Sequence, residues 1–247
     1  MPSFLLDPGL LVILGVIALV SFATEGAIGF GGTVLAASIG AQVADLEVLL
    51  PAFVPLNILM SSWLLSRGVR TVAWRMLLVE VVPAVAVGAA VGLALPFASW
   101  IPFAFGVFVV GLAMFQLLRP ADAALPRVAQ LGFLALGGIA HGLFGTGGPM
   151  IVYVARRRLA DKLAFRSTLA VLWLALNAAL LTKFITTGLY QRPVFEVGSV
   201  LALVIVPGLF IGDRIHRKLD AARFERVVWL VLLLAGCALA VRSAFAL

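Results

Sequence analysis

Long apolar stretches follow one another along the chain and are separated by short polar segments. An apolar run of about 18–25 residues is long enough to cross about 30 Å of hydrocarbon. Two stretches, 10–41 and 128–155, are too long for one straight span, and each contains a glycine-rich interruption that leaves pieces of about 10–16 residues. The other six stretches are predicted to be transmembrane helices over residues 48–66, 76–95, 99–118, 167–187, 194–212 and 226–244.

The two interruptions, at 26–33 and 142–149, share one glycine spacing. Further matches follow in the same order, because Asn57 corresponds to Asn177 and, later, a proline and a glycine recur together. Ordered matches of this kind indicate a duplication, with repeat 1 over residues 1–125 and repeat 2 over 126–247. The matched glycines are Gly26, Gly29, Gly31 and Gly32 with Gly142, Gly145, Gly147 and Gly148, and the later pairs are Pro83 with Pro207 and Gly88 with Gly212.

Composition identifies an integral membrane protein. Hydrophobic residues make up 63% of the chain, charged residues 12%, and the mean hydropathy is +1.17, whereas soluble proteins are about 45–50% apolar and about 25% charged. The net charge of +7 therefore reflects basic cytoplasmic loops rather than a nucleic-acid partner. A single cysteine, Cys237, excludes an intrachain disulfide. The N-terminus lacks the basic region and cleavage pattern of a signal peptide.

The distribution of lysine and arginine decides how the two broken stretches run. If both are re-entrant hairpins that enter and leave on one face, the loops at 67–75, 119–127, 156–166 and 214–226 share one side of the membrane. Those loops hold fifteen of the 18 lysines and arginines, as the positive-inside rule requires of the cytoplasmic side. A single crossing by each broken stretch would divide these loops between both sides.

The predicted fold is thus an all-α polytopic membrane protein with two repeats, each a glycine-broken re-entrant hairpin followed by three transmembrane helices. Three full crossings per repeat make the repeats inverted, and both termini are predicted outside. The glycine tips of the two hairpins could then meet near the midplane. Broken helices in corresponding repeat positions are typical of substrate sites in secondary transporters.

The broken backbone itself is the predicted substrate site. Irregular backbone at membrane depth is tolerated only where protein or water satisfies it, and each break leads into another helix, near Thr33 and near Pro149. A helix N-terminus offers unpaired N–H groups and about half a positive charge, which suits a small anion. The alternative is that the glycines only allow close helix packing. The predicted substrate-binding residues at the breaks are Gly29, Phe30, Gly31, Gly32, Thr33, Gly145, Thr146, Gly147 and Gly148.

Four polar residues inside the apolar stretches complete the prediction. Glu25 and His141 stand immediately before the two interruptions, and ionisable residues inside a membrane suggest function. Both are candidates for proton coupling, or are structural groups that hold the hairpins. Asn57 and Asn177 could bind the anion or connect helices by hydrogen bonds.

Other chemistries lack their motifs. The chain shows no metal-ligand spacing, no nucleophile elbow and no Lys-Ser/Thr ending of a nucleotide-binding loop, so we expect no metal, no cofactor and no enzyme. An anion channel remains an alternative, since half-helix tips also build selectivity filters, and an intramembrane enzyme with His141 as base is a weaker one.

The motifs resemble those of the TauE/SafE family of sulfite exporters and related anion permeases. The resemblance rests on residues 26–33, on 142–149 followed by Tyr153, and on Arg166-Ser167-Thr168, and in layout it covers essentially the whole chain. Thr33 stands where the second interruption has Pro149. The resemblance implies a bacterial inner-membrane transporter of small sulfur-containing anions, such as sulfite, thiosulfate or organosulfonates, coupled to protons. The expected partners are that anion, protons and the lipid bilayer, with no nucleic acid, and the oligomeric state is left open.

Overall fold

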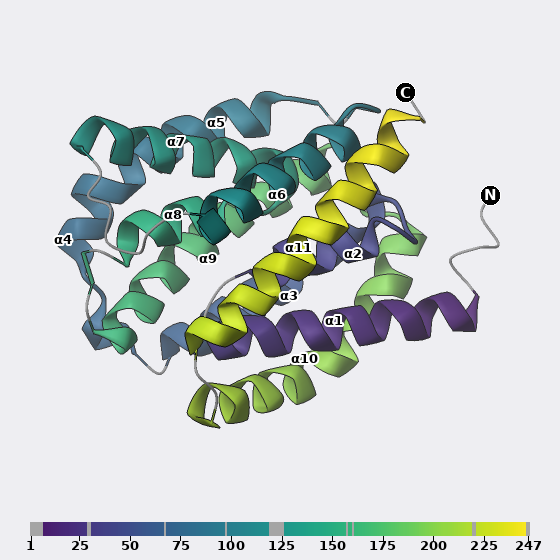
Figure 1. Ribbon diagram of the computed structural model, residues 1–247, viewed down its shortest axis with the longest axis horizontal. Helices are drawn as coiled ribbons and strands as arrows, with labels where there is room; N and C mark the ends of the chain where they lie inside the picture. Colours follow the sequence, from purple (N-terminus) through teal and green to yellow (C-terminus); the bar gives the residue numbers. More distant parts are fainter. Residues whose placement is uncertain are drawn as a thin grey trace. The chain divides into compact units, whose positions relative to one another are not determined.

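The fold is all-helical in the part of the chain that the computed structural model describes, namely residues 7–28, 31–66, 68–96, 98–118, 126–156, 158–159, 161–218 and 221–245. Within these ranges eight helices are long and apolar enough to cross a membrane, which confirms the polytopic α-helical class. The elements, shown in Figure 1, are α1 Pro8–Ile28, α2 Gly32–Gly40, α3 Leu46–Ser66, η2 Val69–Thr71, α4 Trp74–Met76, the π-helical turn η3 Leu77–Val81, α5 Val82–Ala94, α6 Ile101–Leu118, α7 Arg127–Phe144, α8 Gly148–Ala155, α9 Lys162–Thr186, α10 Arg192–Lys218 and α11 Ala221–Ala244.

The six predicted spans all appear as helices, but several helices continue beyond the apolar stretch. α9 begins at Lys162, five residues before the predicted start, because the Asp161 carboxylate caps it by accepting the N–H of Ala164 at 2.7 Å. α10 runs on to Lys218 rather than stopping at 212. The apolar stretch therefore does not mark where α9 and α10 begin and end, and for α9 the Asp161 cap sets the start.

Both broken stretches are broken where the glycine motifs predict, but the pieces are unequal. α1 has 21 residues and α2 has 9, while α7 has 18 and α8 has 8, so the expected length of 10–16 residues is wrong for all four. The first piece is longer because Gly26 and Gly142 remain inside their helices. A Cβ on either glycine would approach the backbone of a neighbouring helix, so these two glycines serve close packing.

At each break the chain turns back on itself. Gly32, at the start of α2, lies against the Ser21 carbonyl oxygen of α1. In the second break a Cβ on Gly137 of α7 would lie 2.8 Å from Cγ1 of Ile151 in α8. Each pair is therefore a helical hairpin, which we call hairpin 1 (α1–α2) and hairpin 2 (α7–α8).

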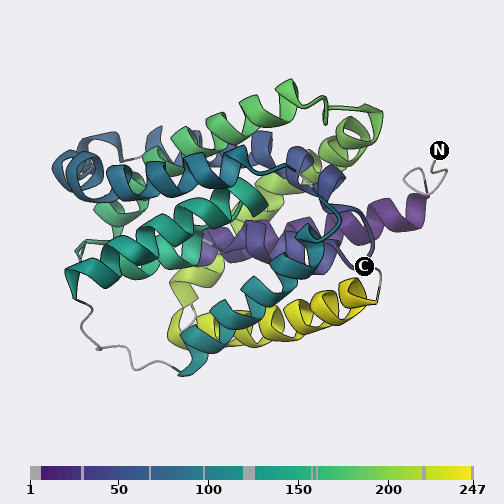
Figure 2. The same ribbon diagram turned by 90° about the horizontal axis from the view of Figure 1, so that it is seen from above.

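One compact unit consists of residues 1–53, 97–123 and 189–247 and holds hairpin 1. Within it α1 packs along α10 in the same direction, since Gly15 lies beside Val200 and Gly26 beside Leu209. α6 packs along α11 in the opposite direction, with Gly106 against Ala240 and Val109 against Gly236. Figure 2 shows α6 in teal and α11 in yellow running side by side.

The other unit consists of residues 54–96 and 124–188 and holds hairpin 2. Here α5 and α7 run in the same direction and pack at backbone distance through four glycines. A Cβ on any of them would collide with main-chain atoms of the other helix, so the two helices form one closely packed pair. The glycines are Gly88 and Gly92 of α5 and Gly138 and Gly142 of α7.

The directions of α6 and α11 bear on topology. Suppose that hairpin 2 crossed the membrane once. Three crossings, by hairpin 2, α9 and α10, would then separate α6 from α11, and α6 and α11 would run parallel. They run antiparallel, as a hairpin that returns to its own side requires. With hairpin 2 returning, the parallel α1 and α10 require hairpin 1 to return as well. The inverted repeat and its boundary at 125/126 stay predictions, because the compact units are defined by packing and not by ancestry.

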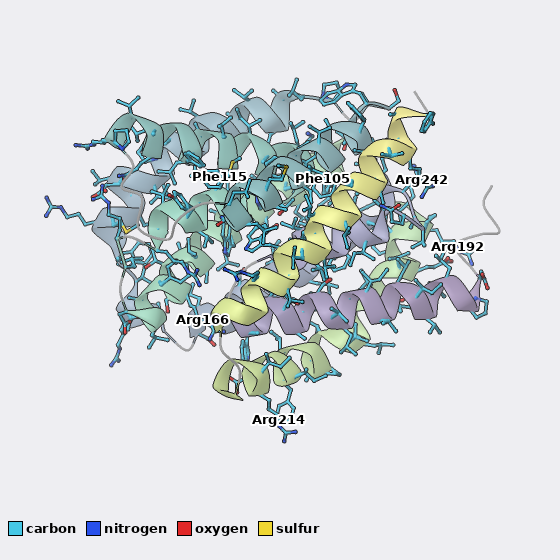
Figure 3. The ribbon with its side chains drawn as sticks, viewed as in Figure 1. Phe105, Phe115, Arg166, Arg192, Arg214 and Arg242 are labelled. Atoms are coloured by element: carbon cyan, nitrogen blue, oxygen red, sulfur yellow. The ribbon has the colours of Figure 1, made fainter. Side chains whose placement is uncertain are left out.

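Charged residues at the ends of α10 and α11 fit the same arrangement. Arg192 begins α10, whereas Arg214 lies near its other end, and Arg242 lies in the last turn of α11. Figure 3 shows Arg192 and Arg242 at one end of their unit and Arg214 at the opposite end. The basic loop predicted to be cytoplasmic therefore lies away from the two arginines predicted outside.

Candidate functional site

Hairpin 2 turns through a glycine that ends α7. Gly145 has φ +65°, which a residue with a Cβ adopts only at a cost of about 1 kcal/mol, and its N–H donates to the carbonyl oxygen of His141 at 2.8 Å. Two residues later α8 begins at Gly148, with Pro149 in its first turn. Proline fits there because it carries no N–H and its φ is already helical. The break thus leads directly into the N-terminus of a further helix, as the sequence predicts, and this N-terminus is largely buried.

His141 is a buried histidine whose ring forms no hydrogen bond with the described residues. Its side chain is 4% exposed, and neither ring nitrogen has a hydrogen-bond partner within the described chain. The ring stacks on the indole of Trp173, with centroids 6.0 Å apart and planes at 12°. A Cβ on Gly148 would lie 3.8 Å from that same indole. His141 and the start of α8 therefore border one aromatic surface.

Two further predicted residues in this unit are buried polar groups. Thr146, in the turn of hairpin 2, is 4% exposed. Asn177 of α9 donates from Nδ2 to the Trp173 carbonyl oxygen at 2.9 Å, while its buried Oδ1 accepts no hydrogen bond from the described residues. A buried polar atom without a partner costs about 1–3 kcal/mol. Asn177 Oδ1 and the two His141 nitrogens therefore keep a hydrogen-bonding capacity that the described residues do not use.

The sequence of this unit contains two acidic residues, and both are engaged in contacts. Glu80 is 3.2 Å from Arg158 in a salt bridge, and Asp161 caps α9. Lys183 donates from Nζ to the carbonyl oxygen of Leu95 at 2.8 Å and lies 3.5 Å from that of Gly142. It therefore brings a positive charge to the C-terminal ends of α5 and α7, where helix dipoles favour one.

Hairpin 1 has a different local arrangement. Gly31 has φ +89° and precedes α2. Gly32 lies directly against the carboxylate and Cβ of Glu25, so that any larger residue at position 32 would collide with this side chain. The Glu25 carboxylate is thus at the N-terminus of α2, where a negative charge is stabilised. Hairpin 1 therefore has a carboxylate at the start of its second helix, whereas in hairpin 2 the corresponding position before the break is His141.

The return end of hairpin 1 is fixed by α11. Arg242 donates from Nη1 to the carbonyl oxygens of Ala41 and Gln42, and Gln42 donates from Nε2 to the Ala235 carbonyl oxygen at 3.3 Å. A cation at the last carbonyls of a helix is stabilised by the helix dipole. Arg242 therefore holds the C-terminal end of α2 in place.

The remaining predicted site residues are placed as follows. Thr33 is half-buried in the first turn of α2, and Asn57 is 5% exposed within α3. Gly29 and Phe30 lie outside the described residues. Whether the tips of the two hairpins meet depends on the placement of the two units, so that part of the site stays a prediction.

Two residues of structural importance are missed by motif analysis. Trp173 belongs to no recognised motif. Its spacing of four residues from Asn177 could have identified it, because residues one helical turn apart lie on the same face. Tyr190 donates from its hydroxyl to the Pro51 carbonyl oxygen at 2.8 Å. Pro55, four residues after Pro51, lacks the N–H that would otherwise pair with this carbonyl. Burial raises the pKa of Tyr190 to about 12.

A comparison with known proteins identifies the family of this chain. The family model described as Sulfite exporter TauE/SafE matches residues 13–239. The chain belongs to the TauE/SafE family. The "Probable inner membrane transporter protein TsaS" of Comamonas testosteroni is 27% identical over 215 residues, which cover 85% of this chain and 87% of the relative. No solved structure matches the chain.

Membership confirms the resemblance seen in the sequence and makes this TauE/SafE chain a membrane transporter. The family and the relative are transporters and not enzymes, in agreement with the expectation that the chain has no catalytic role. The match runs from within α1 to within α11 and so includes both breaks and every helix between α1 and α11. The breaks are therefore part of the region on which the family assignment rests.

Proposed function

We propose that this TauE/SafE protein is a proton-coupled secondary transporter of a small sulfur-containing anion, of the sulfite, thiosulfate or organosulfonate class. Its place is the inner membrane of a bacterium, with both termini outside. The family's description as sulfite exporters and the relative's name as an inner membrane transporter support the substrate class and the location. The observation that carries the proposal is the buried His141, whose ring nitrogens have no hydrogen-bond partner among the described residues and whose ring stacks on Trp173, the indole that also borders Gly148 at the start of α8.

In hairpin 2 the anion binds at the first turn of α8. The N–H groups of Gly147, Gly148 and Met150 have no carbonyl four residues earlier within α8 and can donate to its oxygens. His141 adds an N–H donor, and protonation makes it a cation as well. The hydroxyl of Thr146 supplies a further donor close to the turn. A tetrahedral or pyramidal oxyanion presents several acceptor oxygens, which suits a set of converging donors.

Hairpin 1 supplies the coupling to protons. An ionised Glu25 competes with the anion for the N-terminus of α2, since both are negative and both are stabilised there. Protonation of Glu25 removes that competition, so an anion and a proton are carried together. When the anion leaves, the carboxylate releases its proton and returns to the helix end. Gly32 permits this contact because it has no side chain.

Proteoliposomes test the proposal directly. We expect flux of labelled sulfite or a sulfonate to be driven by an imposed pH gradient in the native protein. In Glu25→Gln, whose side chain carries no charge at any pH, anion exchange continues but no longer follows the pH gradient. Flux that follows only the anion gradient in both proteins would show that protons are not coupled.

A counter-flow experiment separates a carrier from a channel. Unlabelled anion on the opposite side of the membrane should accelerate exchange of labelled anion, and the rate should saturate with concentration, because a carrier turns over one bound substrate at a time. Large single-channel currents without saturation would contradict the carrier mechanism.

A further inference from the structure

A cavity that opens to the surface lies outside both hairpin turns, in the unit that holds hairpin 2. It has a volume of about 700 Å³ and is formed by the segment from Ala73 to Glu80 together with Arg127, the first residue of α7. Trp74 and two arginines, Arg75 and Arg127, line it. None of these residues belongs to the predicted anion site.

The charge of this cavity is positive. Its one acidic lining residue, Glu80, forms a salt bridge with Arg158 at 3.2 Å, and Arg158 also donates to Oε1 of Gln130 at 3.1 Å. Arg75 and Arg127 are exposed and form no salt bridge with any residue that the structure describes. Two guanidinium groups therefore face one cavity without a neutralising carboxylate. The unpaired first-turn amides of α7 add to the positive potential.

The position of the cavity suits the polar surface of a membrane. Trp74 is 49% exposed and stands at the start of a membrane-spanning helix, where tryptophan is enriched at the level of the lipid headgroups. The exposed Val79, on the lining of the same cavity, is apolar. The π-helical turn Leu77–Val81 brings Val79 and Glu80 to this lining, and π-turns of this kind are frequent at functional sites. Basic groups next to apolar surface match a charged headgroup with an acyl chain.

We propose that this cavity binds the phosphate headgroup of an anionic phospholipid, with Arg75 and Arg127 on the phosphate oxygens and Trp74 at the level of the glycerol backbone. Arginine forms two parallel hydrogen bonds to phosphate, and basic pockets between transmembrane helices on the cytoplasmic side bind anionic lipids. The lipid contacts the N-terminal end of α7, so its binding stabilises the helix that carries His141. This inference is independent of which anion the protein transports.

The test compares thermal stability and lipid affinity in detergent. Phosphatidylglycerol should raise the melting temperature of the native protein more than phosphatidylcholine does, and native mass spectrometry should detect retained phosphatidylglycerol. In Arg75→Gln/Arg127→Gln we expect the dissociation constant for phosphatidylglycerol to rise about tenfold or more, because the two arginines that bind the headgroup are lost. Arg214→Gln/Arg226→Gln is the matched control, since it removes two exposed arginines elsewhere, and it should keep the native affinity.

Inorganic phosphate distinguishes a lipid from a free ion. Phosphate at the same concentration should give little stabilisation, because it lacks the acyl chains that contact the apolar lining. Stabilisation by phosphate without an effect of phosphatidylglycerol would overturn the lipid assignment. An equal effect of both lipids, or an unchanged affinity in the double variant, would also overturn it. The single variants Arg75→Gln and Arg127→Gln give the same readout if the double variant does not fold.

Discussion

At the scale of single residues, His141 shows what a sequence can and cannot reveal. A histidine beside a glycine-rich break inside an apolar stretch is a candidate site residue from its position alone. Its stack on Trp173 depends on α9, which begins 21 residues later in the chain. No local pattern encodes that contact, so the sequence identifies the residue but not its surroundings.

Replacement of His141 by phenylalanine tests its role in binding. The phenyl ring can keep the stack on Trp173, but it removes both nitrogens. We expect His141→Phe to fold and to lose at least tenfold in affinity for the stabilising anion, because a hydrogen bond to a charged group contributes about 1.5–3 kcal/mol. A thermal-shift titration with sulfite, thiosulfate and sulfonates measures this, since a ligand of the folded state raises its stability.

The control for this variant is the other histidine of the chain. His216→Phe makes the same chemical change in α10, outside the hairpin turns, and should leave the thermal shift unaltered. Equal losses in both variants, or an unchanged affinity in His141→Phe, would exclude His141 from the binding site.

Tyr190 provides a prediction about stability. Its hydroxyl pairs with the Pro51 carbonyl oxygen that Pro55 leaves free, so Tyr190→Phe should lower the free energy of unfolding by about 1 kcal/mol at neutral pH. In a Pro55→Ala background the carbonyl regains a helical partner, and the loss should shrink. An undiminished loss in that background would show that the hydroxyl acts elsewhere.

The same hydrogen bond has a defined pH dependence. Burial raises the pKa of Tyr190 from 10.0 to about 12, so the folded state holds its proton longer than the unfolded state. The stabilisation is present below pH 10 and is lost as the pH rises toward 12. Ultraviolet titration should therefore find a tyrosine with a midpoint near 12 that is absent in Tyr190→Phe.

At the scale of helices, the glycines of the two motifs divide into those that turn the chain and those that pack it. Sequence spacing predicts that both stretches are broken, and the breaks occur at Gly31 and Gly145 with positive φ. It does not predict that Gly26 and Gly142 stay helical. Their partners lie in α10 and α5, far away in the chain, so only the packed structure shows which glycine has which role.

Two glycines of α7 test this division within one helix. A Cβ on Gly138 would collide with the Val85 carbonyl oxygen of α5, whereas one on Gly132 would meet no atom within 4 Å. Gly138→Ala should therefore destabilise the protein by about 1–3 kcal/mol through overpacking. Gly132→Ala should leave stability unchanged or raise it by up to about 1 kcal/mol, because alanine favours a helix. Equal melting temperatures for the two variants would contradict the close packing of α5 on α7.

At the scale of the whole molecule, the lysine and arginine distribution and the helix directions lead to one topology by separate routes. The lysine and arginine distribution is a property of the loops, and the helix directions are a property of the packed helices. Both require two hairpins that return to their own side of the membrane. Neither route identifies which side of the membrane is which. That assignment rests on the positive-inside rule alone, and it needs a measurement of its own.

Cysteine labelling in whole bacterial cells supplies that measurement. In a Cys237→Ser background, Thr187→Cys places a thiol in the exposed turn between α9 and α10, and Val69→Cys places one in η2, where the side chain is 52% exposed. An impermeant maleimide should label Thr187→Cys in intact cells and Val69→Cys only after permeabilisation, since the loop at 67–75 is predicted to be cytoplasmic. Labelling of both thiols in intact cells would place both positions on the outer side, with an even number of crossings between them. The three-span repeat would then be wrong. The reverse pattern would keep the fold but invert its orientation, which would place the cavity at Arg75 and Arg127 on the outer face.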